Sequence, residues 1–214
     1  DSTLPLEQTW SWLAKYLKGD SSVDTGPAFT WIDQRGRFRS AADYPVASSR
    51  ISARGKGELR LKDKGGSGPY TGKLPSSISP TFSLVLRPTI PAPAKNAVSV
   101  GIKAKKAAVV VGAPKLHLSY KGTSKNKKVR VLAQLVDPKT KTVVGNQITP
   151  LALTLNGKRH KNDVAMEEIT FSLRKGQRLQ VQIVANSGAY DTFPKGGRVS
   201  FSKVKIGLPV VKPS

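Results

Sequence analysis

Alternation of apolar and polar residues along the second half of the chain most constrains its fold. Every second residue is apolar in the stretches 116–120 and 129–135, and lysines and other polar residues fill most of the intervening positions. Alternate side chains of a strand point to opposite faces, so this period of two predicts half-buried β-strands. Turn signals recur about every ten residues, which predicts an antiparallel β-sandwich.

Further strands are expected elsewhere in the chain by the same reasoning. Phe29 and Trp31, the turn 33–36 and Phe38 predict a hairpin. The remaining expected strands cover 58–61, 81–86, 164–173 and 178–185. Two more hairpin turns are predicted, at 137–142 and at Asn156-Gly157, because Asn-Gly is the strongest short hairpin signal.

The last expected strand, 198–208, requires an irregularity. Val199 and Phe201 fall on one parity, whereas Val204, Ile206 and Leu208 fall on the other. A β-bulge near Ser202-Lys203 would place all five apolar side chains on the inner face.

One amphipathic helix is predicted near the start of the chain. Leu6, Trp10, Leu13 and Leu17 recur at spacings of four, three and four residues, and Gly19 favours a stop. Trp12 and Tyr16 make a second apolar side, so the helix is expected to need a packing partner on each side. Leu6, Trp10, Leu13 and Leu17 are therefore candidates for docking against another domain.

Two stretches of the chain are expected to lack regular structure. The Gly-, Ser- and Pro-rich stretch 64–80 is expected to be a loop. The stretch 86–96 contains three prolines and is expected to be a linker or a surface crossing.

Positive charge is concentrated in the second part of the chain. The net charge is +23, and residues 95–214 carry 23 basic and 5 acidic residues. Contact with an anionic polymer, such as a nucleic acid, a cell-wall phosphate polymer or a glycan, or with an acidic membrane, is one function class that fits this charge; a merely solubilising surface is the alternative. The candidate anion-binding residues are Lys125, Lys127, Lys128, Arg130, Lys158, Arg159, Lys161, Arg174, Lys175 and Arg178.

No catalytic, metal or cofactor site is predicted. The chain contains no cysteine and two histidines, which excludes thiolate chemistry and a histidine-rich metal site. Gly65-Gly-Ser67-Gly68 resembles a nucleophile elbow, but Pro69 replaces the final glycine and a flexible loop is expected. His117 is expected to be exposed or paired across strands, and His160 to lie in a solvated turn. No apolar run is long enough to cross a bilayer.

Several short motifs, in a characteristic order, resemble one family. They are Trp12-Leu-Ala-Lys-Tyr-Leu-Lys-Gly19, Gly26-Pro-Ala-Phe-Thr-Trp31, 36–45, Val110-Val-Gly-Ala-Pro114, Ala133-Gln-Leu-Val-Asp137 and Lys175-Gly-Gln-Arg-Leu179. Together they resemble the C-terminal part of Xaa-Pro dipeptidyl-peptidases and cocaine-esterase-type serine hydrolases, the CocE/NonD group. The resemblance implies a jelly-roll β-sandwich, galactose-binding-like in fold, preceded by the last helix of an α/β-hydrolase domain. By this resemblance we expect residues 1–45 to form the terminal helix and hairpin of an α/β-hydrolase-type domain or a linker, and residues 46–214 to form the sandwich.

By this resemblance the catalytic residues would all precede Asp1, and the chain alone would be inert. The implied function is that of a noncatalytic accessory domain, which packs on a catalytic α/β-hydrolase domain or chain and shapes substrate access. The parent enzyme would be a serine peptidase or esterase that cleaves an ester bond or a peptide bond after an Xaa-Pro pair. Homo-oligomer contacts are a further implied use.

A free-standing cationic module that binds anionic polymers is the alternative function. Secretion or location in the cell envelope is expected from the habit of the family and from the absence of a leader sequence at Asp1.

Overall fold

The computed structural model describes residues 4–46, 49–74, 76–190 and 196–212. The contacts between residues divide the chain into two compact units, Asp1–Val46 and Ala47–Ser214. The chain is mainly β, with strands that pair antiparallel in every ladder. The expected mainly β fold with an N-terminal helix is therefore confirmed.

The first unit consists of the helix α1 (Leu4–Tyr16) and a hairpin formed by β1 (Phe29–Ile32) and β2 (Phe38–Ala41). The predicted helix is confirmed. Gly19 adopts a φ of 77°, and the N–H of Asp20 then donates to the carbonyl of Ala14. A left-handed residue directly after a helix commonly satisfies its last carbonyls in this way.

The predicted β1–β2 hairpin is also confirmed. Phe29 pairs with Ala41 and Ile32 pairs with Phe38. Asp33 stabilises the turn, because its buried carboxylate accepts hydrogen bonds from the N–H groups of Arg35 and Arg37 and from the Arg37 guanidinium. The turn is thus closed by a local ion pair with an N···O distance of 3.0 Å.

The second unit is a β-sandwich with one short helix, α2 (Pro80–Thr89). Its strands are β3 (Ser49–Arg60), β4 (Ala97–Lys103), β5 (Ala108–Gly112), β6 (Lys115–Asp137), β7 (Thr142–Ala165), β8 (Ile169–Leu173), β9 (Arg178–Val184) and β10 (Arg198–Val211).

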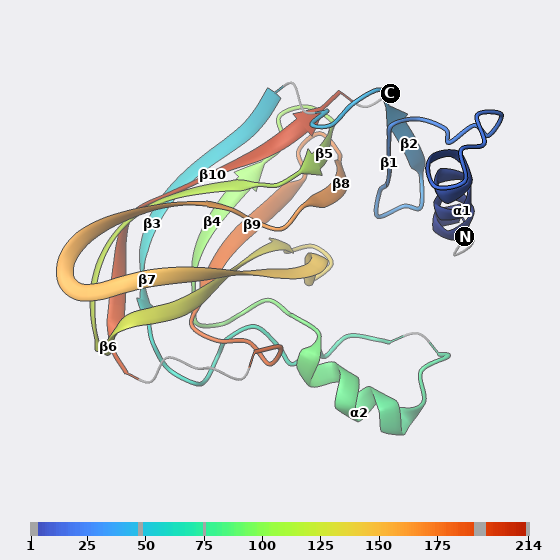
Figure 1. Cartoon of the computed structure of the whole chain (residues 1–214). Coiled ribbons are helices and arrows are strands. Elements are labelled where there is room, and N and C mark those ends of the chain that lie inside the picture. Colours follow the sequence, from blue (N-terminus) through green and yellow to red (C-terminus); the bar gives the residue numbers. More distant parts are fainter. Residues whose placement is uncertain (1–3, 47–48, 75, 191–195, 213–214) are drawn as a thin grey trace. The chain divides into compact units, whose positions relative to one another are not determined.

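Two layers share the long strands β6 and β7. The first layer has the order β3–β10–β6–β7 and uses the start of β6 and the end of β7; the second has the order β4–β9–β6–β7 and uses the end of β6 and the start of β7. Figure 1 shows these two strands as one hairpin that bends around a side of the sandwich. The short strands β5 and β8 continue from the end of β10.

The inner faces of the two layers form one apolar core. It includes the predicted alternating residues Leu116, Leu118, Tyr120, Val131 and Leu135, each at most 4% exposed. The alternation was interpreted correctly, but both stretches belong to the single strand β6. The expected β-sandwich is confirmed.

The predicted hairpin turn at Asn156-Gly157 is wrong, because β7 continues through it. Thr123 pairs with Asn156 and Lys121 pairs with Arg159, so β7 contains one extra residue between these pairs. Gly157 accommodates this bulge with a φ of 83°. The Asn-Gly signal therefore marks a bulge in a bent strand. The other predicted turn, 137–142, is confirmed between β6 and β7.

The predicted bulge in β10 is confirmed. The register of β10 against both β3 and β6 shifts directly after Phe201. Val199, Phe201, Val204, Ile206 and Leu208 are consequently all buried, with exposed fractions of 1% or less.

The expected strand 81–86 is wrong, because these residues belong to α2. Ser79 caps the helix by accepting a hydrogen bond from the N–H of Phe82, and Pro80 occupies the first turn, where its missing N–H costs nothing. The helix also takes Pro80, the last residue of the expected 64–80 loop, and residues 86–89 of the expected 86–96 linker. The Arg87 guanidinium holds it by donating to the carbonyls of Tyr70 and Gly72.

Candidate functional site

The predicted docking residues lie on α1 and directly after it. Leu6, Trp10 and Leu17 are 58%, 63% and 77% exposed, whereas Leu13 is half-buried. On the other side of the helix, Trp12 and Tyr16 contact each other with ring centroids 5.1 Å apart, and both are more than half exposed. Five large apolar side chains in a short segment are thus available for contact.

The ten predicted anion-binding residues do not form one patch. Lys125, Lys127, Lys128, Arg130 and Lys158 lie where β6 and β7 bend from one layer to the other. Arg174 and Lys175 lie in the turn between β8 and β9, and Arg178 begins β9. Arg159 and Lys161 lie on the outer face of the first layer.

Many lysines and arginines lie on the outer face of the first layer. Registered pairs place Lys121 beside Arg159, Ser200 beside both Lys121 and Glu58, and Lys205 beside Arg54. We call this surface the basic face and define it by its exposed or half-buried lysines and arginines: Arg50, Arg54, Lys56, Arg60, Lys115, Lys121, Arg159, Lys161, Arg198, Lys203 and Lys205.

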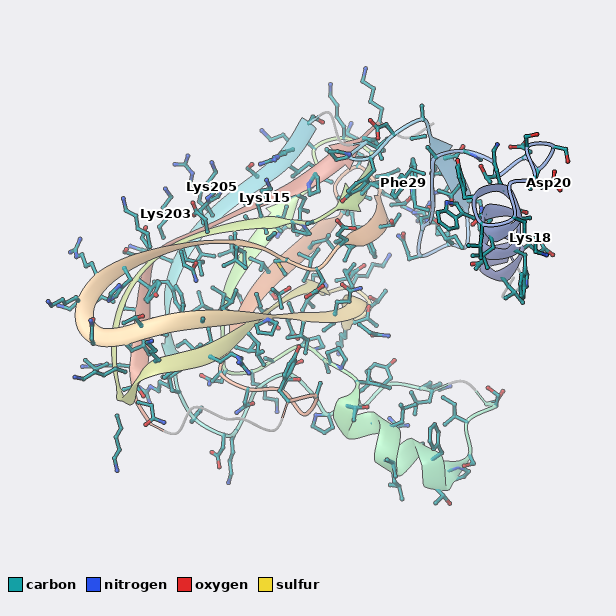
Figure 2. The ribbon with its side chains drawn as sticks, in the orientation of Figure 1. Lys18, Asp20, Phe29, Lys115, Lys203 and Lys205 are labelled. Carbon is teal, nitrogen blue, oxygen red and sulfur yellow. The ribbon has the colours of Figure 1, made fainter. Side chains whose placement is uncertain are left out.

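The cations of the basic face project outward from the sandwich. Figure 2 shows Lys115, Lys203 and Lys205 extending from the same side of the sandwich, away from its core. Glu58 and Asp163 are the acids on this face. Asp163 accepts from His117 at 2.8 Å, which confirms the expected cross-strand pairing of that histidine. In the described part of the chain, none of the lysines and arginines of the basic face takes part in an ion pair.

A groove runs across the basic face. Its volume is about 1130 Å³, and its lining includes Lys121, Arg159, Lys161, Arg198 and Lys203. A second hollow of about 270 Å³ shares Lys161 and Lys203 with the groove and extends toward Lys205. Positive side chains from β6, β7 and β10 therefore line these two adjoining hollows.

Sequence reasoning missed most of the basic face, and β3 above all. The expected strand at 58–61 is the end of a strand that begins at Ser49. Within β3, Arg50, Arg54, Lys56 and Arg60 share one parity, a period of two that was readable in the sequence. Gly55 and Gly57 obscured it, because glycine lowers strand propensity.

Ser67, which was considered as a nucleophile, is buried and hydrogen-bonded to the backbone. Ser67 is 2% exposed, and its Oγ accepts a hydrogen bond from the N–H of Ala92 at 3.2 Å. Ser67 lies in a loop, as expected, and not in a strand-to-helix turn; backbone hydrogen bonds to Asn186 and Gly188 hold it there. No group of three His, Cys, Asp or Glu side chains in the described residues could hold a metal ion.

His160 is in strand β7, so its expected place in a solvated turn is wrong. It is half-buried, its ring stacks on Tyr120 with centroids 5.7 Å apart, and its Nε2 lies 2.8 Å from Asn156 Oδ1. Neither histidine lies in a contact with Ser67. The described residues therefore contain no Ser-His pair arranged for nucleophilic catalysis.

Other surface features point to no further chemistry. Tyr190 packs against a small apolar cluster with Leu132, Ile148 and Val184, and its hydroxyl donates to Ile148. It is thus not an exposed platform for a sugar ring. Within the described residues, neither helix is long and apolar enough to cross a membrane.

Solved structures resemble this chain over nearly its whole length. A CocE/NonD family hydrolase from Staphylococcus aureus matches 96% of this chain with a TM-score of 0.64 and 12% sequence identity. An aminopeptidase from a marine sediment Thaumarchaeota archaeon matches 95% at a TM-score of 0.65 and 9% identity. An α-amino acid ester hydrolase matches 94% of this chain with a TM-score of 0.59 and 11% sequence identity. No family model matches the sequence, and no curated protein does.

The match covers 46%, 43% and 44% of these three structures, respectively. The chain therefore spans less than half the length of the solved hydrolases that it resembles. The identity is low, so the likeness establishes the fold and not the activity. At the level of fold, the expected resemblance to the CocE/NonD group is confirmed, and it includes both α1 and the sandwich.

Proposed function

We propose that this chain is a noncatalytic accessory part of a larger hydrolase of the CocE/NonD kind. The asymmetry of the structural match supports this proposal: nearly all of this chain corresponds to less than half of each hydrolase chain. The missing half would be the catalytic α/β-hydrolase domain, either in the same polypeptide or in a partner chain.

The apolar side chains of α1 supply the docking surface. Trp10 and Leu6 lie one helical turn apart, and Leu17 extends the same side beyond the helix. Burying one such side chain contributes roughly 1.5–3 kcal/mol to the free energy of association. Monomeric soluble proteins rarely expose a large contiguous apolar patch. A catalytic domain packed on α1 would remove this apolar surface from water.

We further propose that the domain shapes substrate access. A rigid sandwich beside the catalytic domain would form part of the wall of the active-site entrance and limit which substrates enter. By the resemblance to the CocE/NonD group, the proposed substrate is a small ester, or a peptide whose bond after an Xaa-Pro pair is cleaved. Secretion or the cell envelope is the proposed location.

A serine-reactive fluorophosphonate probe tests the proposal on native material. The protein is isolated from its source with an antibody raised against this chain, and the isolate is treated with the probe. We expect a labelled catalytic domain, in the same polypeptide or in a co-isolated chain, and we expect its labelled tryptic peptide to contain a G-x-S-x-G sequence.

A pair of variants then tests the docking surface. Trp10→Glu should release the labelled partner or, in a single polypeptide, expose the junction to proteolysis. Lys18→Gln is the matched control, because it changes the charge by the same amount at an exposed neighbouring site without removing apolar area. A native isolate that contains only an unlabelled chain of 23.0 kDa would overturn the proposal.

A further inference from the structure

We infer that the basic face binds a flexible linear polymer of phosphodiester groups. This inference is independent of the accessory role proposed above, because it concerns the outer face of the first layer and not α1. It rests on the charge, the spacing and the chemistry of the side chains on four adjacent strands.

The first observation is unbalanced charge. Eleven lysines and arginines share the face with two acids, Glu58 and Asp163, and Asp163 is already paired with His117. Like charges on neighbouring strands repel one another and destabilise the sheet. A bound polyanion would relieve this repulsion and release its own counterions on binding.

The second observation is the short distance between cations within a strand and between neighbouring strands. Lys203 and Lys205 on β10, like Arg54 and Lys56 on β3, are two residues apart, and therefore about 6.8 Å apart along the strand. Neighbouring strands add cations about 4.8 Å to the side. Charges at such intervals suit a ligand that carries one negative group in each short repeat.

The third observation is the chemistry between the cations. Ser119 and Ser200 line the groove and offer hydroxyl groups that can donate to phosphate oxygens. Ser202 also lines the groove, but its hydroxyl donates to the carbonyl of Ser119. No Phe, Tyr or Trp side chain among the described residues projects outward from the basic face; Tyr120 borders the groove but is 4% exposed and belongs to the core. Single-stranded nucleic acids are normally bound through stacking of bases on aromatic rings.

The shape of the face adds a fourth observation. The groove of about 1130 Å³ and the adjoining hollow of about 270 Å³ form a depression that is open to solvent and crosses several strands. A flexible chain can follow such a depression with successive phosphates. A polymer of glycerol phosphate fits these requirements, because it carries a charge in every repeat and has neither bases nor sugar rings.

Binding of a short synthetic poly(glycerol phosphate) to the full 214-residue chain tests the inference. Affinity is measured by fluorescence anisotropy between 0.05 and roughly 0.3 M salt, a range across which electrostatic binding changes steeply. Duplex DNA and heparin serve as competitors at equal charge concentration. We expect binding at about 0.15 M salt and weaker binding of both competitors.

Two triple variants with equal loss of charge separate the basic face from the net charge. Lys121→Gln, Arg159→Gln and Lys203→Gln remove three cations from the groove. The control replaces Lys105, Lys106 and Lys175, which are exposed and lie in turns, by Gln. We expect the groove variant to lose at least roughly tenfold in affinity. The slope of the logarithm of its binding constant against the logarithm of the salt concentration should become shallower by about two units. The control variant should lose much less affinity.

Three outcomes would overturn the inference. They are an absence of binding at about 0.15 M salt, equal losses in the two triple variants, and tighter binding of duplex DNA or heparin than of poly(glycerol phosphate). Thermal unfolding of both variants checks that they remain folded. Removal of an acid from the groove supplies a gain-of-affinity test that does not depend on folding defects.

Discussion

Gly55 of β3 faces Val100 of β4 across the sandwich so closely that a Cβ atom on Gly55 would lie 2.5 Å from Val100 Cγ2. Gly57 has the same relation to Val98, at 3.0 Å. β3 and β4 are the edge strands of the two layers, on the side opposite to β7. These two glycines therefore determine how closely the two layers approach each other there.

Gly55→Ala is expected to destabilise the sandwich by about 1–3 kcal/mol, because the added methyl group must displace a β-branched side chain of the core. Gly101→Ala is the matched control: Gly101 lies in β4, and its added Cβ would meet nothing within 4 Å. Alanine there should be neutral or slightly stabilising. Urea unfolding midpoints of the two variants measure the difference, and similar midpoints would refute the close packing of β3 on β4.

Deletion of Ser202 should be tolerated better than deletion of Ser200. Without Ser202 the bulge disappears, and Phe201 and Val204 still point inward because they remain two positions apart. Without Ser200, Ser202 would occupy the buried position of Phe201. The free energy of unfolding should then fall by about 3–5 kcal/mol, as it does when a large core side chain is replaced by a small one. Denaturant unfolding of both deletion variants checks the order, and the reverse order would contradict the bulge.

Ser67→Ala should lower the stability by about 1–3 kcal/mol, because it leaves the buried N–H of Ala92 without its acceptor. The exposed Ser200→Ala should change stability by no more than about 0.5 kcal/mol. The same samples can be treated with a fluorophosphonate, and no label is expected on Ser67. Labelling of Ser67 in the parent chain, lost in the Ala variant, would assign it a nucleophilic role instead.

Trp10→Glu combined with Leu17→Glu should reduce the binding of a hydrophobic dye such as ANS, because both side chains are more than half exposed. The unfolding free energy should shift by about 0.5 kcal/mol or less, as is usual for exposed positions. Lys18→Gln should leave the dye signal unchanged. Unaltered dye binding in the double variant would mean that the accessible apolar surface lies elsewhere.

Glu58→Gln is expected to strengthen binding of poly(glycerol phosphate), because it removes a negative charge that lines the groove. Glu167→Gln removes an exposed acid outside the basic face and should have a smaller effect. Anisotropy titrations at low and high salt compare the two, and the difference should shrink as salt screens the charges. Equal gains from both variants would show that only the total charge matters.

Local patterns predicted the elements that depend on local rules. The α1 helix, the 33–36 turn and the β10 bulge each follow from side-chain periodicity and from turn residues, and all three are present. The β10 bulge is informative, since the requirement that Val199 and Val204 share one face was enough to locate it.

Nonlocal packing decided the elements that were missed. Gly55 and Gly57 discourage a strand locally, yet β4 requires them for its close approach. Asn156-Gly157 favours a tight turn locally, yet long-range pairing with β6 carries β7 through it. The basic face was hidden for the same reason, because it is assembled by register between strands that are distant in the sequence.

The continuity of β7 has a consequence for self-association. Among the described strands, β7 pairs with β6 alone, so the other side of its backbone is a sheet edge. Side chains bind a few groups of β7: Tyr190 donates to the carbonyl of Ile148, Asn162 donates to the carbonyl of Ala152, and Tyr120 accepts from the N–H of Thr154. Such an edge is a template on which a second copy can add a strand and start aggregation. Lys158, Arg159 and Lys161 lie along it, and Pro150 removes one donor. Two copies that approach edge to edge would therefore repel each other, and this protection would weaken as ionic strength rises.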